Sequence, residues 1–234
     1  MSFFTSLGIL FLAMLIQVFL QLSPGVFAIF YHSALANHTH KKADDLALGF
    51  ILGQEIFAAI VFLTTYLFAA FSFQDPNFFT ANILPWLLVG VFTAEAIFIL
   101  CFYFRHDKSI KSTRLFITRK SATALTTHAG NVKTRSDAIA LGLVTASLEL
   151  PFTLPLYIIL SLIVTSFPTI SASLLIILYI IVASLPLFAI KFFFAHHNLA
   201  IFVRLRIKYK PLIRLTLTVS YLLVAILIAI RTTL

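Results

Sequence analysis

The 234-residue chain has little of what a water-soluble protein needs. Only 11% of its residues are charged, against roughly 25% in soluble domains, and 61% are hydrophobic. Glycine is also scarce, with 7 residues against 26 phenylalanines, which excludes collagen-like and flexible linker sequences. A surface of this composition cannot be solvated by water. The sequence therefore predicts an all-α, polytopic membrane protein.

The sequence also lacks the residues and motifs of several classes of enzyme and metal site. The one cysteine, Cys101, excludes an internal disulfide, a Cys-x-x-Cys redox pair and a zinc site built from thiolates. The sequence also lacks His-Glu-x-x-His, Gly-x-Ser-x-Gly and a phosphate-binding glycine loop. We therefore predict no enzyme activity, no catalytic residues, no cofactor and no metal centre.

Apolar stretches of membrane-spanning length recur along the chain. A hydrocarbon core of about 30 Å needs about 20 helical residues. None of the stretches alternates polar and apolar residues as the strands of a membrane barrel do. The sequence predicts six transmembrane helices, at residues 3–31, 46–72, 82–104, 138–165, 168–194 and 212–230.

Basic residues are distributed very unevenly between the connecting segments. All 17 lysines and arginines except Arg231 lie in or beside the connections that follow the first, third and fifth spans. By the positive-inside rule these three connections face the cytoplasm of the plasma (inner) membrane, and both termini face outward. The net charge of +9 is therefore expected to contact anionic lipid headgroups on the cytoplasmic side and not nucleic acid. The sequence leaves the oligomeric state open, a homo-oligomer included.

Six spans divide into two halves of three. We expect a first three-helix repeat over 1–104, a basic cytoplasmic loop over 105–137 and a second three-helix repeat over 138–234. Because three is odd, the second repeat would be inverted relative to the first, as in many transporters.

Each half begins with a span that contains a helix breaker. Pro24 and Gly25 interrupt the first span, and Pro151 follows Glu149 in the fourth. A proline inside a helix frees backbone groups that hydrocarbon cannot satisfy, so paired breaks point to a central binding site. Prolines that simply kink membrane helices are the alternative interpretation.

Three glutamates lie inside the predicted spans, namely Glu55, Glu95 and Glu149. A carboxylate at the bilayer centre costs several kcal/mol unless it is protonated, paired or in contact with water. No lysine or arginine lies deep enough in a span to pair with them. We therefore expect neutral carboxyl groups that can exchange a proton when water reaches them, with Glu149 the strongest candidate because it adjoins Pro151.

Glutamines accompany these carboxyl groups. Gln17 and Gln21 are four residues apart and share a helix face, and Gln54 directly precedes Glu55. We expect Gln21, Gln54, Glu55 and Glu149 to line one polar pocket. Hydrogen bonds that only join helices to one another are the alternative.

Two sequence segments resemble known membrane families. The chain resembles the lysine exporter (LysE/RhtB) superfamily in three motifs. These are Leu22-Ser23-Pro24-Gly25, Ser33-Ala34-Leu35 and Leu48-Gly49-Phe50-Ile51-Leu52-Gly53. This resemblance implies a six-span exporter of a small solute. Leu148-Glu149-Leu150-Pro151 is similar to CcdA/DsbD-type electron carriers, but the chain lacks the paired thiols that such carriers need.

Three functions are compatible with these residues. We expect foremost a secondary transporter that exports a small polar solute, such as an amino acid, coupled to proton or ion exchange. A divalent or heavy-metal cation exporter would use Glu55, Glu95 and Glu149 as oxygen ligands. In a non-transporting membrane scaffold or assembly subunit, these glutamates would bind neither a proton nor a solute.

Overall fold

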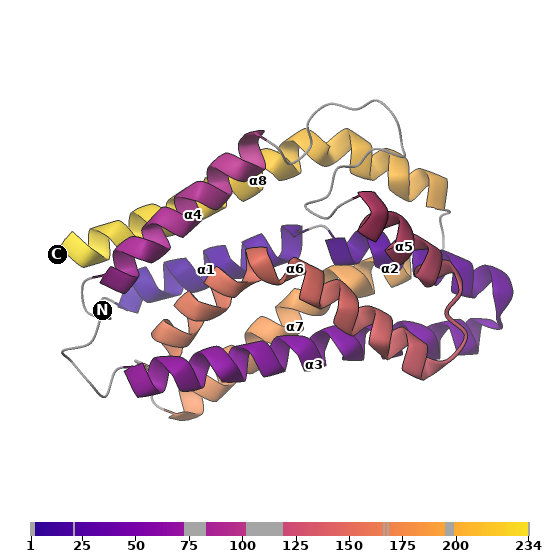
Figure 1. Ribbon diagram of the computed structural model, residues 1–234, viewed down its shortest axis with the longest axis horizontal. Coiled ribbons are helices and arrows are strands. Elements are labelled where there is room, and N and C mark those ends of the chain that lie inside the picture. The colour runs from indigo at the N-terminus through magenta and orange to yellow at the C-terminus, as the bar shows by residue number, and fades with distance from the viewer. Residues whose placement is uncertain are drawn as a thin grey trace.

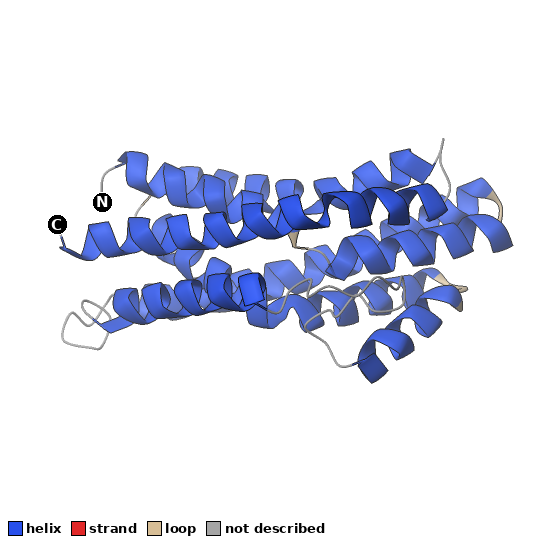
Figure 2. Cartoon of the chain, turned by 90° about the horizontal axis from the view of Figure 1, so that it is seen from above, coloured by secondary structure: helices blue, strands red, loops and turns tan. Residues whose placement is uncertain are grey.

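The computed structural model describes residues 3–20, 22–72, 83–101, 119–165, 167, 169–194 and 199–233. The regular structure in these ranges is entirely helical (Figure 2), which confirms the predicted all-α class. The helices are α1 (Phe3–Phe19), α2 (Leu22–Asn37), α3 (His40–Ser72), α4 (Ile83–Cys101), α5 (Arg119–Gly130), α6 (Arg135–Val164), α7 (Thr169–Phe194) and α8 (Leu199–Thr233).

Five of these helices are long and apolar enough to cross a membrane, namely α3, α4, α6, α7 and α8. The protein is therefore a multi-pass membrane protein. The apolar helix α1 has 17 residues and is about 25 Å long at 1.5 Å per residue, shorter than a hydrocarbon core of about 30 Å. A sixth crossing would have to combine α1 with α2, and it stays a prediction.

The long helices alternate in direction along the chain (Figure 1). As a result, α1 begins and α8 ends at one end of the bundle, which we call the termini end. At the opposite end α3 and α6 begin and α7 finishes. Because Lys41, Lys42, Arg135 and Lys191 lie in those helix ends, we call it the basic end. Of the predicted loop, residues 102–118 lie outside the described residues, and α5 forms within the remainder.

The first predicted span is interrupted, but not at Pro24 and Gly25. α1 ends at Phe19, Leu20 is not helical, and α2 begins at Leu22. Pro24 is therefore the third residue of α2. The backbone amides of a first helical turn have no acceptor within the helix, so a proline there removes no helical hydrogen bond. The predicted position of the break was wrong by about one turn.

The predicted break in the fourth span does not form. α6 continues through both Pro151 and Pro155 to Val164. Side-chain donors reach neighbouring carbonyl groups: Thr153 donates to the carbonyl oxygen of Glu149 at 3.3 Å, and Tyr221 to that of Phe152 at 3.0 Å. Membrane helices tolerate prolines where neighbouring helices and side-chain donors surround the backbone beside them.

Helices α3 and α6 cross at very short range through glycines. A Cβ atom on Gly53 would overlap the carbonyl of Ile139, and one on Gly142 would overlap the carbonyl of Phe50. Gly49 lies against Arg135 and Ala138 in the same contact. Small residues let the backbones of membrane helices approach closely, as the Gly49-x-x-x-Gly53 spacing predicts.

The buried apolar residues form two clusters, one toward each end of the bundle. The cluster at the termini end joins α1 and α4 to the far halves of α3 and α6 and includes Phe92 and Tyr221. The cluster at the basic end joins α2 and α5 to the near halves of α3 and α6 and includes Phe27, Phe30 and Phe50. The break between α1 and α2 therefore separates helices that belong to different clusters.

Replacing Gly53 or Gly142 by alanine should destabilise the protein by about 1–3 kcal/mol, because the added Cβ meets a backbone carbonyl that cannot move freely. Gly90 is a matched control, since its helical position in α4 has open space where a Cβ would lie. Gly90→Ala should be neutral or stabilising by up to about 1 kcal/mol. Thermal unfolding of the purified variants in detergent measures the difference, and Gly53→Ala as stable as Gly90→Ala would contradict the close crossing.

Candidate functional site

A small polar cavity lies between α1, α3, α6 and α7. Its volume is about 30 Å³, enough for one or two water molecules. Its polar lining consists of Gln17, Gln54, Glu55, Glu149, Thr153 and Tyr157. Three of the four predicted pocket residues, Gln54, Glu55 and Glu149, therefore meet at one place.

The residues of α6 that line the cavity with polar groups are spaced four positions apart. Glu149, Thr153 and Tyr157 follow one another at this spacing, which places them on one face of the helix. Glu149 and Thr153 are buried, with 7% and 3% of their surface exposed. Sequence reasoning identified Glu149 but missed Thr153 and Tyr157, although the same spacing could have indicated them.

The cavity lies at the boundary of the two apolar clusters. On α3, buried residues of the basic-end cluster stop at Ile51 and those of the termini-end cluster begin at Ala58, with Gln54 and Glu55 between them. Glu149 is the fifteenth of the 30 residues of α6, so it lies at mid-length. The polar groups thus form a thin layer midway between the ends of the bundle.

Part of the hydrogen-bonding capacity of this layer is unused. The Nε2 atom of Gln54 and the Oε2 atom of Glu55 are buried without a hydrogen-bond partner. Buried polar atoms are nearly always paired, because an unpaired one costs about 1–3 kcal/mol. Two such atoms meet at the cavity, and two others, Oε2 of Glu95 and Oγ1 of Thr218, lie outside it.

Two tyrosines pack against each other at the cavity, and one of them, Tyr157, lines it. Tyr179 of α7 donates a hydrogen bond to Oε1 of Gln17 at 3.2 Å. Its ring meets that of Tyr157 edge to face at a centroid distance of 5.9 Å, and Tyr157 meets Phe62 in the same way at 6.5 Å. Gln17 lines the cavity, and Gln21, which we predicted to line it, lies outside the described residues.

Glu95 does not line the cavity. It is buried on α4, with 9% of its surface exposed, and interacts with Tyr221 of α8. The three intramembrane glutamates therefore do not gather at one place. Across the described residues no group of three or more His, Cys, Asp or Glu side chains is arranged to hold a metal ion.

The backbone residues of the candidate pathway lie in different places relative to the cavity. Gly25 is buried in the first turns of α2, within the helix that follows the break. Pro151 is exposed on α6 and does not line the cavity. Pro186 of α7, which sequence reasoning missed, does line it.

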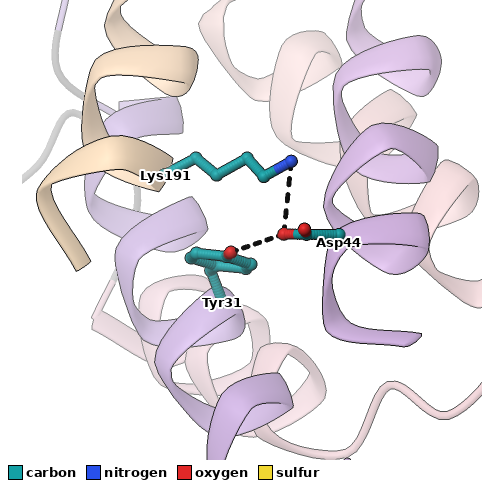
Figure 3. A network of polar contacts seen from close by, with 3 residues as sticks. All are labelled: Tyr31, Asp44 and Lys191. Carbon is teal, nitrogen blue, oxygen red and sulfur yellow. Dashed lines mark hydrogen bonds and ion pairs between the residues drawn. The ribbon is translucent and has the colours of Figure 1, made fainter. Parts of the chain in front are cut away.

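An ionic network joins three helices at the basic end (Figure 3). The Nζ atom of Lys191 on α7 lies 3.2 Å from Oδ1 of Asp44 on α3. The hydroxyl of Tyr31 on α2 donates to the same oxygen at 2.7 Å. The Tyr31 ring stacks on Phe27, so the network lies directly against the basic-end cluster. Nearby, Arg135 pairs with Asp45 at 3.4 Å, and both of these side chains are about half exposed.

Comparison with protein-family models, with curated proteins and with solved structures gave no significant match.

Replacing Asp44 by alanine should cost more stability than replacing its neighbour Asp45. Asp44 accepts a hydrogen bond and an ion pair from partly buried partners, whereas Asp45 has one half-exposed ion pair. Exposed pairs contribute about 0–1 kcal/mol and hydrogen bonds to charged groups about 1.5–3 kcal/mol. We expect a difference of about 1 kcal/mol or more in thermal unfolding, and equal losses for both variants would refute a specific role of the network.

Proposed function

We propose that the chain is a secondary transporter that exports a small polar solute, such as an amino acid, in exchange for protons or another ion. The observation that carries this proposal is the polar cavity at mid-length of the bundle, to which α3 and α6 each contribute a glutamate. Transporters bind substrates and coupling ions near the bilayer midplane, often beside interrupted helices. Here the interruption at Leu20 is part of the cavity wall.

The carboxyl groups supply a coupling mechanism. Glu149 is the proposed proton site, and Glu55 and the glutamines assist it in binding solute. A carboxyl group shielded from water favours its neutral form, and one in contact with water favours its charged form. Alternate wetting of the cavity from the two ends would therefore load and release a proton at Glu149.

The two apolar clusters are the proposed gates. A cavity of about 30 Å³ cannot hold an amino acid, so a solute must separate helices in order to bind. Opening the basic-end cluster would admit solute from one side, and opening the termini-end cluster would release it on the other. By the positive-inside rule the basic end faces the cytoplasm, which gives the direction of export.

The packing of the helices supports the proposed inverted repeats. In such an arrangement α4 is the counterpart of α8, and these two helices pack side by side (Figure 1). The contact between α3 and α6 would correspond to that of α7 with α1 and α2, and both contacts are present.

The two alternatives receive less support from this geometry. A divalent-cation exporter with three glutamate ligands would need Glu95 beside Glu55 and Glu149, and Glu95 lies elsewhere. A scaffold would be expected to fill the centre of its bundle with apolar side chains and not with polar atoms that lack partners.

Glu149→Gln should reduce proton-coupled transport at least tenfold, because glutamine keeps the shape of the side chain but cannot bind and release a proton. Glu55→Gln should reduce it as well. The measurement is proton flux and movement of radiolabelled amino acids in proteoliposomes under an imposed pH gradient.

Glu95→Gln is the matched control, since Glu95 is equally buried in the bundle but does not line the cavity. It should retain most of the flux. Transport by Glu149→Gln at the wild-type rate, with a correctly folded protein, would remove the basis of the proposed mechanism.

A further inference from the structure

A second, larger cavity adjoins the polar one. It has a volume of about 360 Å³ and lies between the end of α1, the second half of α7 and the first half of α8. Small-molecule sites have volumes of about 300–1,000 Å³. Its lining is apolar except for Tyr209, and includes Phe19, Ile190, Phe193, Phe202 and Leu205. We call it the apolar groove.

The groove and the polar cavity share part of their walls. Leu20 and Pro186 line both. Leu20 lies just beyond the end of α1, where its amide still donates to the carbonyl oxygen of Ile16, and the ring of Pro186 replaces an amide hydrogen in α7. Small movements of these two residues would connect the spaces.

The chemistry of the polar cavity selects the charge of a ligand. Glu55 and Glu149 line it, and no lysine, arginine or histidine does so among the described residues. Lys191 follows one turn beyond Leu187 on α7, but it is held by Asp44. Once water has reached and ionised these carboxyl groups, an anion would be repelled there, whereas an ammonium group would be attracted and would offer donors to the unpartnered Oε2 atom of Glu55.

We infer that the transported solute is a cationic amphiphile, whose ammonium group binds in the polar cavity while its hydrocarbon chain lies in the apolar groove. This inference rests on the proposed transport function and changes its substrate class from an amino acid to an ammonium compound with a hydrocarbon chain. An ammonium group is about the size of a water molecule, so it fits a cavity of about 30 Å³ that excludes a whole amino acid. Leu20 and Pro186 would lie beside the bond between head and chain.

The test is ligand binding to the full chain in lipid nanodiscs, with binding to empty nanodiscs subtracted. The probes are octylammonium, methylammonium and octanoate. We expect octylammonium to bind at least tenfold more tightly than methylammonium, because each methylene removed from water contributes roughly fourfold. Octanoate, which has an equally long chain and the opposite charge, should bind at least tenfold more weakly than octylammonium.

Two pairs of variants locate the ligand. Ala189 lines the groove, and Ala189→Trp should abolish the preference for octylammonium over methylammonium. Ala200→Trp is the matched control, because Ala200 is exposed on α8 and lines neither cavity. Glu55→Gln should weaken the binding of both ammonium ions at least tenfold, whereas Glu95→Gln should leave both affinities unchanged.

The remaining outcomes overturn the inference. Equal affinity for octylammonium and methylammonium would show that the groove is not part of the site. Equal affinity for octylammonium and octanoate would show an ordinary lipid-chain site without charge selection, and no binding of either ammonium ion would exclude a cation site. Any of these results would be compatible with proton-coupled flux in proteoliposomes, so the proposed transport function would stand. If the ligands bind as expected but no flux is measured, the transport function is rejected and the binding site stands.

Discussion

The arrangement of this protein depends on the free energy of placing carboxyl groups inside an apolar helical bundle. Glu55 and Glu149 lie at mid-length of long apolar helices, where a charged group costs several kcal/mol without a partner. Among the described residues, no lysine, arginine or histidine lines the cavity with these two glutamates. The structure gathers glutamine, threonine and tyrosine around the carboxyl groups and leaves a space large enough for water or a small cation.

The close crossing of α3 and α6 places the two carboxyl groups at the same level. Gly53 directly precedes Gln54 and Glu55, and Gly142 lies two turns before Glu149 on the facing helix. Because these glycines fix the separation and register of the two backbones, they also fix which polar side chains can share a cavity. The close contact between the glycines therefore also positions the two glutamates of the cavity.

The helical class and the grouping of Gln54, Glu55 and Glu149 in one pocket could be predicted from the sequence. Both predictions depend on local properties, namely the cost of burying a carboxyl group, helix periodicity and the spacing of small residues. The predicted break in α6 does not form, and Tyr221, which donates to the Phe152 carbonyl between the two prolines, comes from a helix about 70 positions later in the chain. The pairing of Lys191 with Asp44 and of Tyr179 with Gln17 was missed for the same reason. Partners from distant segments leave no trace in local spacing.

The backbone irregularities coincide with the boundary between the two apolar clusters. The end of α1 at Leu20, Pro151 in α6 and Pro186 in α7 all lie where the chain passes from one cluster to the other. Pro151 and Pro186 each remove a helical hydrogen bond that would otherwise stiffen the helix at that level. The two clusters are therefore well packed within themselves and joined through weakened backbone. Bending concentrated at this boundary would change access to the polar cavity while leaving the packing of each end intact.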